Sequence, residues 1–340
     1  SLAVNTAHIS IQGAKMERGR SLNLSQNAFS YHRFHKRDKH ICNAIPDNVA
    51  MSAFCNAKKD SHLPLLLSVE AQGTVNGANC NGNTCQNLTG RQVQVTGNET
   101  AKTINVANPL GGTDVHAVTG ASIGLNGASL GTINVGQNVN KRNRNVLWLN
   151  NSILGTFINN GTLTSETTGQ AVNLRGNTSS SITTFTNNGT ITGSSGVWMQ
   201  NSTITTLTNN ANATINSNAT SGRFGAIDLN SNARIDNLIN SGNISNTAHN
   251  TTAAIFFEGR TTNAQIGNLT NNAGGTIQGI SVVAGNGNRI NTINNSGMIN
   301  RGITNGANIG TLTNQNGVYT SNTVRITTRA CYSATIGKVC

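Results

Sequence analysis

The sequence has little charge, few aromatic residues and almost no proline. Of its 340 residues, 10% are charged, 4% are aromatic and 3 are proline, whereas a compact globular domain usually carries about 25% charged residues. Intrinsically disordered chains are charge-rich and poor in β-branched residues, but Ile, Val and Thr occur throughout this chain. Because no run of about 20 apolar residues occurs, we expect no transmembrane helix. The abundant β-branched and turn-forming residues predict an all-β chain of short strands.

The net charge is +12, and it is unevenly distributed. Residues 72–340 carry 14 basic and 6 acidic side chains. Such a mild positive field suits anionic lipid, lipopolysaccharide, glycan or nucleic acid, or it has no anionic partner at all. We expect no nucleic-acid partner, because the basic run at 31–42, "YHRFHKRDKHIC", has no recognisable domain around it.

Residues 1–71 differ from the rest and are predicted to be an N-terminal extension. The stretch 58–71, "KKDSHLPLLLSVEA", has a basic start, a short apolar run and Val69 and Ala71 before Gln72. Signal peptidase reads small residues at such positions, so either a degraded secretory signal or a disordered extension fits. The His and Cys spacing in this segment matches no closed zinc module, so we expect no metal and no cofactor.

Two cysteine pairs are candidate disulfides. Cys80 and Cys85 bracket a tight Gly/Asn loop, "CNGNTC", and Cys331 and Cys340 could close a second small loop. Disulfides are natural in an exported protein, and free cysteines are the alternative for each pair.

One phrase recurs along the chain: an apolar anchor, an asparagine two residues later, and then a Gly or Asn turn. Examples are "FINNGTLT" at 157–164 and "FTNNGTIT" at 185–192. A fixed Asn beside a turn can bond its own backbone, and stacked copies would form an amide ladder. The seven predicted ladder residues are Asn159, Asn187, Asn209, Asn240, Asn271, Asn295 and Asn314.

A second, alternating phrase of apolar-x-apolar lies between the copies of the first, as in Leu147-Trp148-Leu149. Strict alternation predicts a strand with one buried face. Its copies recur about every 26 residues between positions 123 and 303. A leucine-rich repeat has a similar period, but its Leu-x-x-Leu-x-Leu frame is missing, and a propeller blade needs about 40 residues.

Two or three short strands per repeat predict a right-handed parallel β-helix, a solenoid of roughly eight coils. We therefore divide the chain into an extension at 1–71, an N-terminal cap at 72–100, a β-helix at 101–324 and an atypical tail at 325–340.

The stacked "TNNGTI" coils and the Asn/Thr/Gly-rich repeat over about 100–320 resemble the passenger domain of bacterial type V autotransporters, pertactin-like or vacuolating-cytotoxin-like. The resemblance implies an exported protein at the outer membrane or outside the cell, acting as an adhesin on a host or neighbouring-cell glycan or protein. A full autotransporter ends in a membrane barrel, which "RITTRACYSATIGKVC" does not resemble. The chain would thus be a fragment, a truncated product or a passenger without its translocator.

Two alternatives stay open: a toxin-like passenger that self-associates on membranes, and a β-helix polysaccharide lyase or hydrolase. The second needs clustered carboxylates. Only Asp228, Asp236 and Glu258 fall in neighbouring coils, and because Asp236 lies in the other strand we expect that the three do not converge. No nucleophile motif appears in a catalytic context, so we expect no enzyme.

The middle residue of the alternating phrase should point outward, because its neighbours point inward. Both tryptophans fall on this line, beside polar residues that suit sugar or protein contacts. A register slip of one residue would bury them instead. The predicted binding face is Trp148, Asn173, Trp198, Asp228 and Phe256.

Overall fold

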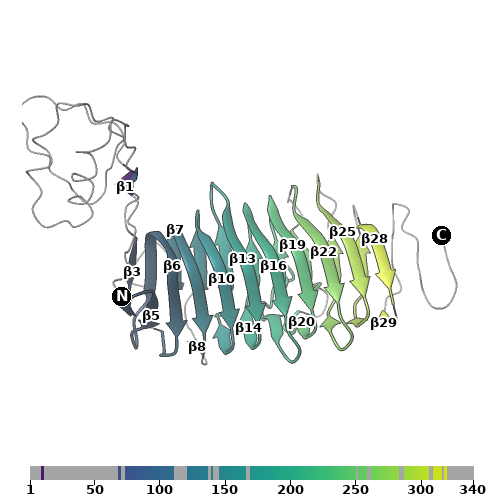
Figure 1. Cartoon of the computed structure of the whole chain (residues 1–340). Coiled ribbons are helices and arrows are strands. Elements are labelled where there is room, and N and C mark those ends of the chain that lie inside the picture. The colour runs from purple at the N-terminus through teal and green to yellow at the C-terminus, as the bar shows by residue number, and fades with distance from the viewer. Residues whose placement is uncertain are drawn as a thin grey trace, which may run out of the picture. The chain divides into compact units, whose positions relative to one another are not determined.

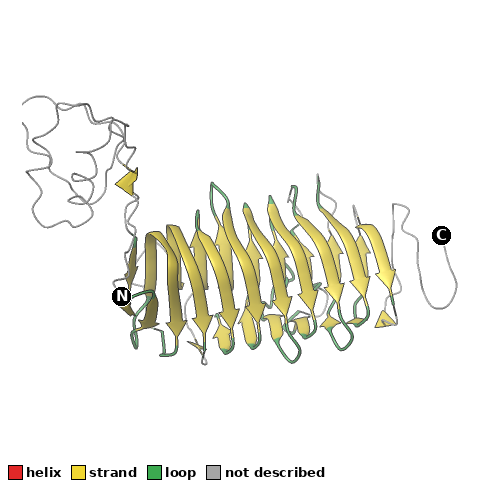
Figure 2. Cartoon of the chain, viewed as in Figure 1, coloured by secondary structure: helices red, strands yellow, loops and turns green. Residues whose placement is uncertain are grey.

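The computed structural model divides into two units, 1–72 and 73–340. It describes residues 9–10, 68–69, 73–110, 121–136, 139–140, 145–165, 169–249, 252–258, 262–282, 287–305, 309–315 and 318–319. In the first unit, strands β1 (Ile9–Ser10) and β2 (Ser68–Val69) pair antiparallel. The described residues of the second unit form strands and connecting turns with no helix (Figure 2).

The second unit is a parallel β-helix in which each coil contributes a strand to three faces. In chain order within a coil we call them the first, second and third face, and on each face the strand of one coil pairs in parallel with that of the next (Figure 1). The first face has β9 (Asn145–Asn150), β12 (Gln170–Arg175), β15 (Val197–Met199), β18 (Ile227–Leu229), β21 (Ile255–Phe257), β24 (Ile280–Val282) and β27 (Ile303–Asn305).

The second face carries the longest regular strands, and the third face the shortest. The second face has β10 (Ile153–Asn159), β13 (Ser180–Asn187), β16 (Ser202–Asn209), β19 (Ala233–Asn240), β22 (Gln265–Asn271), β25 (Arg289–Asn295) and β28 (Ile309–Asn314). The third face has β8 (Val139–Asn140), β11 (Thr162–Thr164), β14 (Thr190–Gly193), β17 (Thr214–Ser217), β20 (Asn243–Asn246), β23 (Thr276–Ile277), β26 (Met298–Ile299) and β29 (Val318–Tyr319).

The N-terminal end of the β-helix is built differently. Strands β6 (Val93–Val106) and β7 (Ala121–Val135) are long: β7 pairs with β9 of the first face and with β10 of the second. Strand β3 (Thr74–Asn76) pairs antiparallel with β6, and β4 (Ala78–Asn81) with β5 (Thr84–Asn87). A disulfide joins Cys80 to Cys85 across that hairpin. Antiparallel strands cap an edge that would otherwise present free backbone groups. The predicted pair Cys331 and Cys340 lies outside the described residues.

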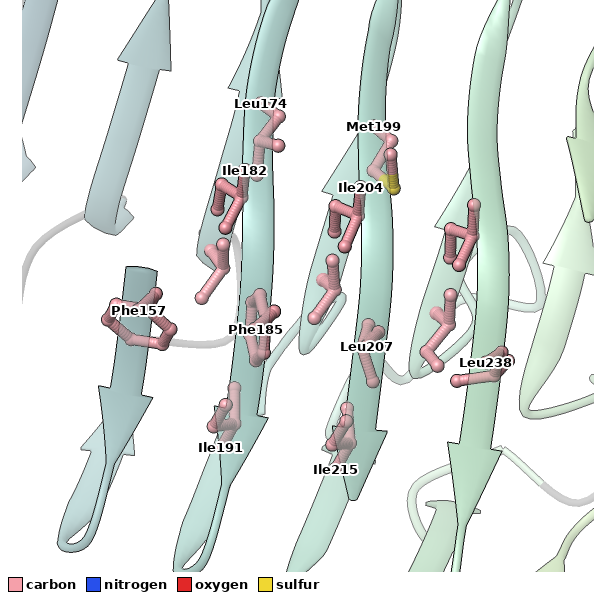
Figure 3. Close-up of a cluster of buried hydrophobic side chains, with 14 of the residues drawn as sticks. Phe157, Leu174, Ile182, Phe185, Ile191, Met199, Ile204, Leu207, Ile215 and Leu238 are labelled. Atoms are coloured by element: carbon pink, nitrogen blue, oxygen red, sulfur yellow. The ribbon is translucent and has the colours of Figure 1, made fainter. Parts of the chain in front are cut away.

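The core is one continuous cluster of apolar side chains stacked from coil to coil (Figure 3). Phe157 and Phe185 occupy the same position in adjacent coils, and their ring centroids are 4.8 Å apart at 63°. Leu207 and Leu238 continue that row. One coil cannot bury these residues alone, so each depends on its neighbours.

In five coils, the turn from the first to the second face contains a residue in the left-handed conformation. Asn151, Asn201, Asn232 and Asn263 adopt φ of 49°, 46°, 55° and 58° there, and Gly287 adopts 81°. Asparagine is one of the few residues with a side chain that tolerates this conformation. The frequent asparagines therefore serve the backbone at this turn.

The seven predicted asparagines lie at the next turn, from the second to the third face, and form one continuous amide ladder. Asn187 Nδ2 donates to Asn209 Oδ1 at 2.8 Å, and Asn209 Nδ2 donates to Asn240 Oδ1 at 2.8 Å. The other steps are equally short, down to the bond between Asn295 and Asn314 at 2.7 Å. The partners are 28, 22, 31, 31, 24 and 19 residues apart, which gives the coil lengths.

Candidate functional site

The middle residues of the first face form one line across the coils, as the alternating phrase predicts. Strand pairing places Trp148 against Asn173, Asn173 against Trp198, Trp198 against Asp228, and Asp228 against Phe256. Ser281 and Thr304 continue the line toward the last described coils.

The expectation that this whole line is exposed is wrong for three of its members. Trp148 is 8% exposed, Asn173 is 4% exposed and Asp228 is fully buried. Trp198 and Phe256 are half-buried. Of the five predicted residues, only Trp198 and Phe256 are partly exposed, so the line is a partly covered row.

At Asp228 and Phe256, a longer coil lies against the row. The two coils that join Asn209 to Asn240 and Asn240 to Asn271 each span 31 residues, against 22 for the preceding coil. Residues 218–226 belong to the first of these insertions. Gly225 bonds to the Asp228 carboxylate through its backbone, and a Cβ at Gly225 would lie only 2.7 Å from Phe256 Cβ. The absence of a side chain there lets the insertion lie against the row.

Asn173 is covered by polar neighbours from the start of the first-face strands. Its Nδ2 donates to Gln170 Oε1 at 3.1 Å and to Asn145 Oδ1 at 3.4 Å. These two bonds fix the orientation of the Asn173 amide and use its Nδ2 donors within the protein.

The three acids do not converge, but two of them, Asp228 and Glu258, interact on this face. Glu258 follows β21 and accepts from Trp198 Nε1 at 3.1 Å and from Asn230 Nδ2 at 2.7 Å. The Glu258 charge also acts on Asp228, whose Oδ2 accepts a hydrogen bond from Ser195 Oγ at 3.1 Å. Asp236, by contrast, lies on the second face in an ion pair with Arg234, as the strand assignment predicted.

Burial raises the pKa of the Asp228 carboxyl well above its ordinary value, and the charge of Glu258 raises it further. The hydrogen bonds from Ser195 and Gly225 oppose this shift but do not reverse it. Asp228 Oδ1 has no hydrogen-bond partner among the described residues. A carboxyl in such surroundings favours its neutral, protonated form.

Sequence reasoning missed Ser195, Asn230 and Glu258 as parts of this site. A signal for two of them was present: Asn230 and Glu258 each lie two residues after the middle residue of their strand, and alternation places them on the same side. Ser195 lies in the connection from the third face to β15, and the alternating pattern does not reach it.

The site combines an indole, a buried carboxyl, a second carboxylate and an amide, which suits contact with a polar ligand. No cluster of three or more His, Cys, Asp or Glu that could hold a metal ion occurs within the described ranges. Within the same ranges, no helix is long and apolar enough to cross a membrane.

Comparison with known proteins adds no relative: no family model, curated protein or solved structure matches this chain.

Proposed function

We propose that the chain is an exported passenger of the autotransporter type, displayed at a cell surface or released, and that it acts as an adhesin. The observation that carries the proposal is the pair of half-buried rings, Trp198 and Phe256, that lie with the Glu258 carboxylate on a stack of coils. Aromatic rings beside carboxylates and amides are suited to sugar or protein contacts. A β-helix holds such groups at fixed spacing because each strand is registered on its neighbours.

Two further features are consistent with export. The second unit carries the Cys80–Cys85 disulfide, and disulfides persist in oxidising compartments. Its low charge and its Asn- and Thr-rich composition resemble the passenger repeats named above.

The test is binding of the full chain to cultured host cells and to immobilised surface glycans. We expect Trp198→Ala and Phe256→Ala to weaken binding by about tenfold or more, as expected when a central aromatic contact is removed. Ile153→Ala is the matched control, because Ile153 is an apolar side chain 52% exposed on the second face. No binding by the unmodified chain, or equal loss in all three variants, would contradict the proposal.

The carboxylate pair also favours one other candidate, a polysaccharide-cleaving β-helix enzyme. Glycoside hydrolysis uses two carboxyl groups, one of them with a raised pKa. Asp228 is fully buried, however, so a substrate could reach it only if the covering segment moved. Release of reducing ends from a polysaccharide, abolished by Glu258→Gln, would favour the enzyme over the adhesin.

A further inference from the structure

The outward side of the second face carries two parallel rows of small side chains, all threonine or asparagine except Ile158 and Ile239 in the second row. The first row lies immediately before the apolar anchors, and the second row lies immediately after them. Strand pairing aligns the first row as Thr103, Thr132, Thr156, Thr184, Thr206, Asn237, Asn268, Thr292 and Thr311. The second row is Asn105, Asn134, Ile158, Thr186, Thr208, Ile239, Thr270, Asn294 and Thr313.

These rows form a grid with a nearly constant spacing. Adjacent strands of a sheet lie about 4.8 Å apart, and residues two apart on one strand are separated by about 6.6 Å. The strands of this face lie side by side and run in one direction (Figure 1). Stacked side-chain ladders favour a flat sheet over a twisted one, and the asparagine ladder borders this face.

Four threonine hydroxyls in the middle of the grid are available to a ligand, whereas toward its ends Asn134 donates to Asn105 and Asn268 donates to Asn237. Thr184 is exposed and Thr186, Thr206 and Thr208 are half-buried. Within the part of the chain that the structure describes, none of these four hydroxyls has a side-chain hydrogen-bond partner. Each threonine also presents a methyl group, so the surface alternates donors and acceptors with small apolar groups.

The composition of the grid indicates the kind of ligand. Neither row contains a charged or an aromatic side chain, and the exposed charges beside the rows on β19, Arg234 and Asp236, pair with each other. The rows themselves are therefore electrostatically matched to an uncharged partner. Sugar sites generally include an aromatic surface, which this grid lacks. A neutral, rigid ligand with a two-dimensional repeat of hydrogen-bonding atoms would meet many of these groups at once.

We propose that this face binds ice. Ice presents neutral rows of oxygen atoms in a flat lattice, and the intervals along and across those rows are comparable to the grid spacings. Ordered water held by the hydroxyl and amide groups would join the lattice, while the methyl groups occupy the gaps between oxygen atoms. The proposal is independent of the adhesin function, which uses the first face.

The experiment measures incorporation of the full chain into a slowly growing ice mass, together with the recrystallisation rate of fine ice. The disruptive variant is Thr184→Lys with Thr206→Lys, two grid residues paired in adjacent coils. The matched control is Thr190→Lys with Thr214→Lys, the same change at a paired position on the third face. Circular dichroism and urea unfolding check that each variant is folded.

We expect the unmodified chain and the control to enter the ice and slow recrystallisation, and the disruptive variant to be excluded. If the lysine pair unfolds the chain, Thr186→Tyr with Thr208→Tyr disturbs the fit with strand-compatible residues and no charge. Exclusion of the unmodified chain from ice overturns the proposal, and so does equal incorporation of every folded variant. Retention on crystalline chitin or cellulose without any effect on ice overturns it in favour of a polysaccharide.

Discussion

The first and second faces belong to the same coils, but they use repetition differently. On the second face, the apolar anchor of each coil lies over the anchor of the preceding coil. The ladder asparagines stack in the same way, and their amides bond to one another. On the first face, the middle residue changes from Trp148 to Asn173 to Trp198 to Asp228. Bonding between equivalent amides restricts the ladder position of the second face to asparagine. The middle position of the first face varies, because no such bond joins its successive residues in the described coils.

The largest expected effect comes from interrupting the second face. Asn209→Ala removes the acceptor of Asn187 Nδ2 and the donor to Asn240 Oδ1, all in the buried interior. Leaving buried polar groups without their partners costs about 1–3 kcal/mol each, so we expect the free energy of unfolding to fall by about 2–4 kcal/mol. Urea denaturation measures the change.

A first-face control makes the comparison direct. Ser281→Ala changes a half-buried middle residue whose hydroxyl has no side-chain hydrogen bond in the described part of the chain. We expect a shift within about 0.5 kcal/mol. Equal losses in the two variants would mean that the asparagine ladder does not distinguish the faces.

A smaller effect, opposite in sign, is expected on the first face. Asp228→Asn replaces a buried carboxyl by a neutral isostere. Because the folded-state pKa of Asp228 lies above its unfolded value, wild-type stability falls as pH rises from the unfolded pKa, near 4, through the raised folded pKa. The variant lacks this loss, so it should exceed the wild type in stability at neutral pH, and the difference should shrink toward pH 4.

Urea midpoints measured between pH 4 and 8 test this expectation, with Asp236→Asn as the control. Asp236 lies in a surface ion pair with Arg234, and such pairs contribute little to stability. A variant that is less stable than the wild type at every pH would show that Asp228 is held ionised and favourably bonded.

The β-helix, the alignment of both phrases and the ladder positions follow from the sequence because they depend on local periods. Apolar anchors at fixed offsets set which side chains face inward, and coil stacking then brings equivalent positions together. The same logic located Trp198, Asp228 and Phe256 in one row.

The cover over that row and the approach of Glu258 to Asp228 did not follow from the pattern. Both depend on how irregular insertions fold, as at Gly225, and on groups such as Ser195 that belong to no repeat. Alternation states which side of a strand a residue lies on, but it does not state whether another segment lies over that side.

The central claim is that the first face carries a covered row with an opening around its second tryptophan. Acrylamide quenching of two single-tryptophan variants of the full chain tests it most directly. With Trp198→Phe, the remaining Trp148 is 8% exposed, so its emission should be blue-shifted and poorly quenched. With Trp148→Phe, the remaining half-buried Trp198 should be quenched more readily. Red-shifted and equally quenched emission from both variants would contradict the account, because the row would then be open along its length.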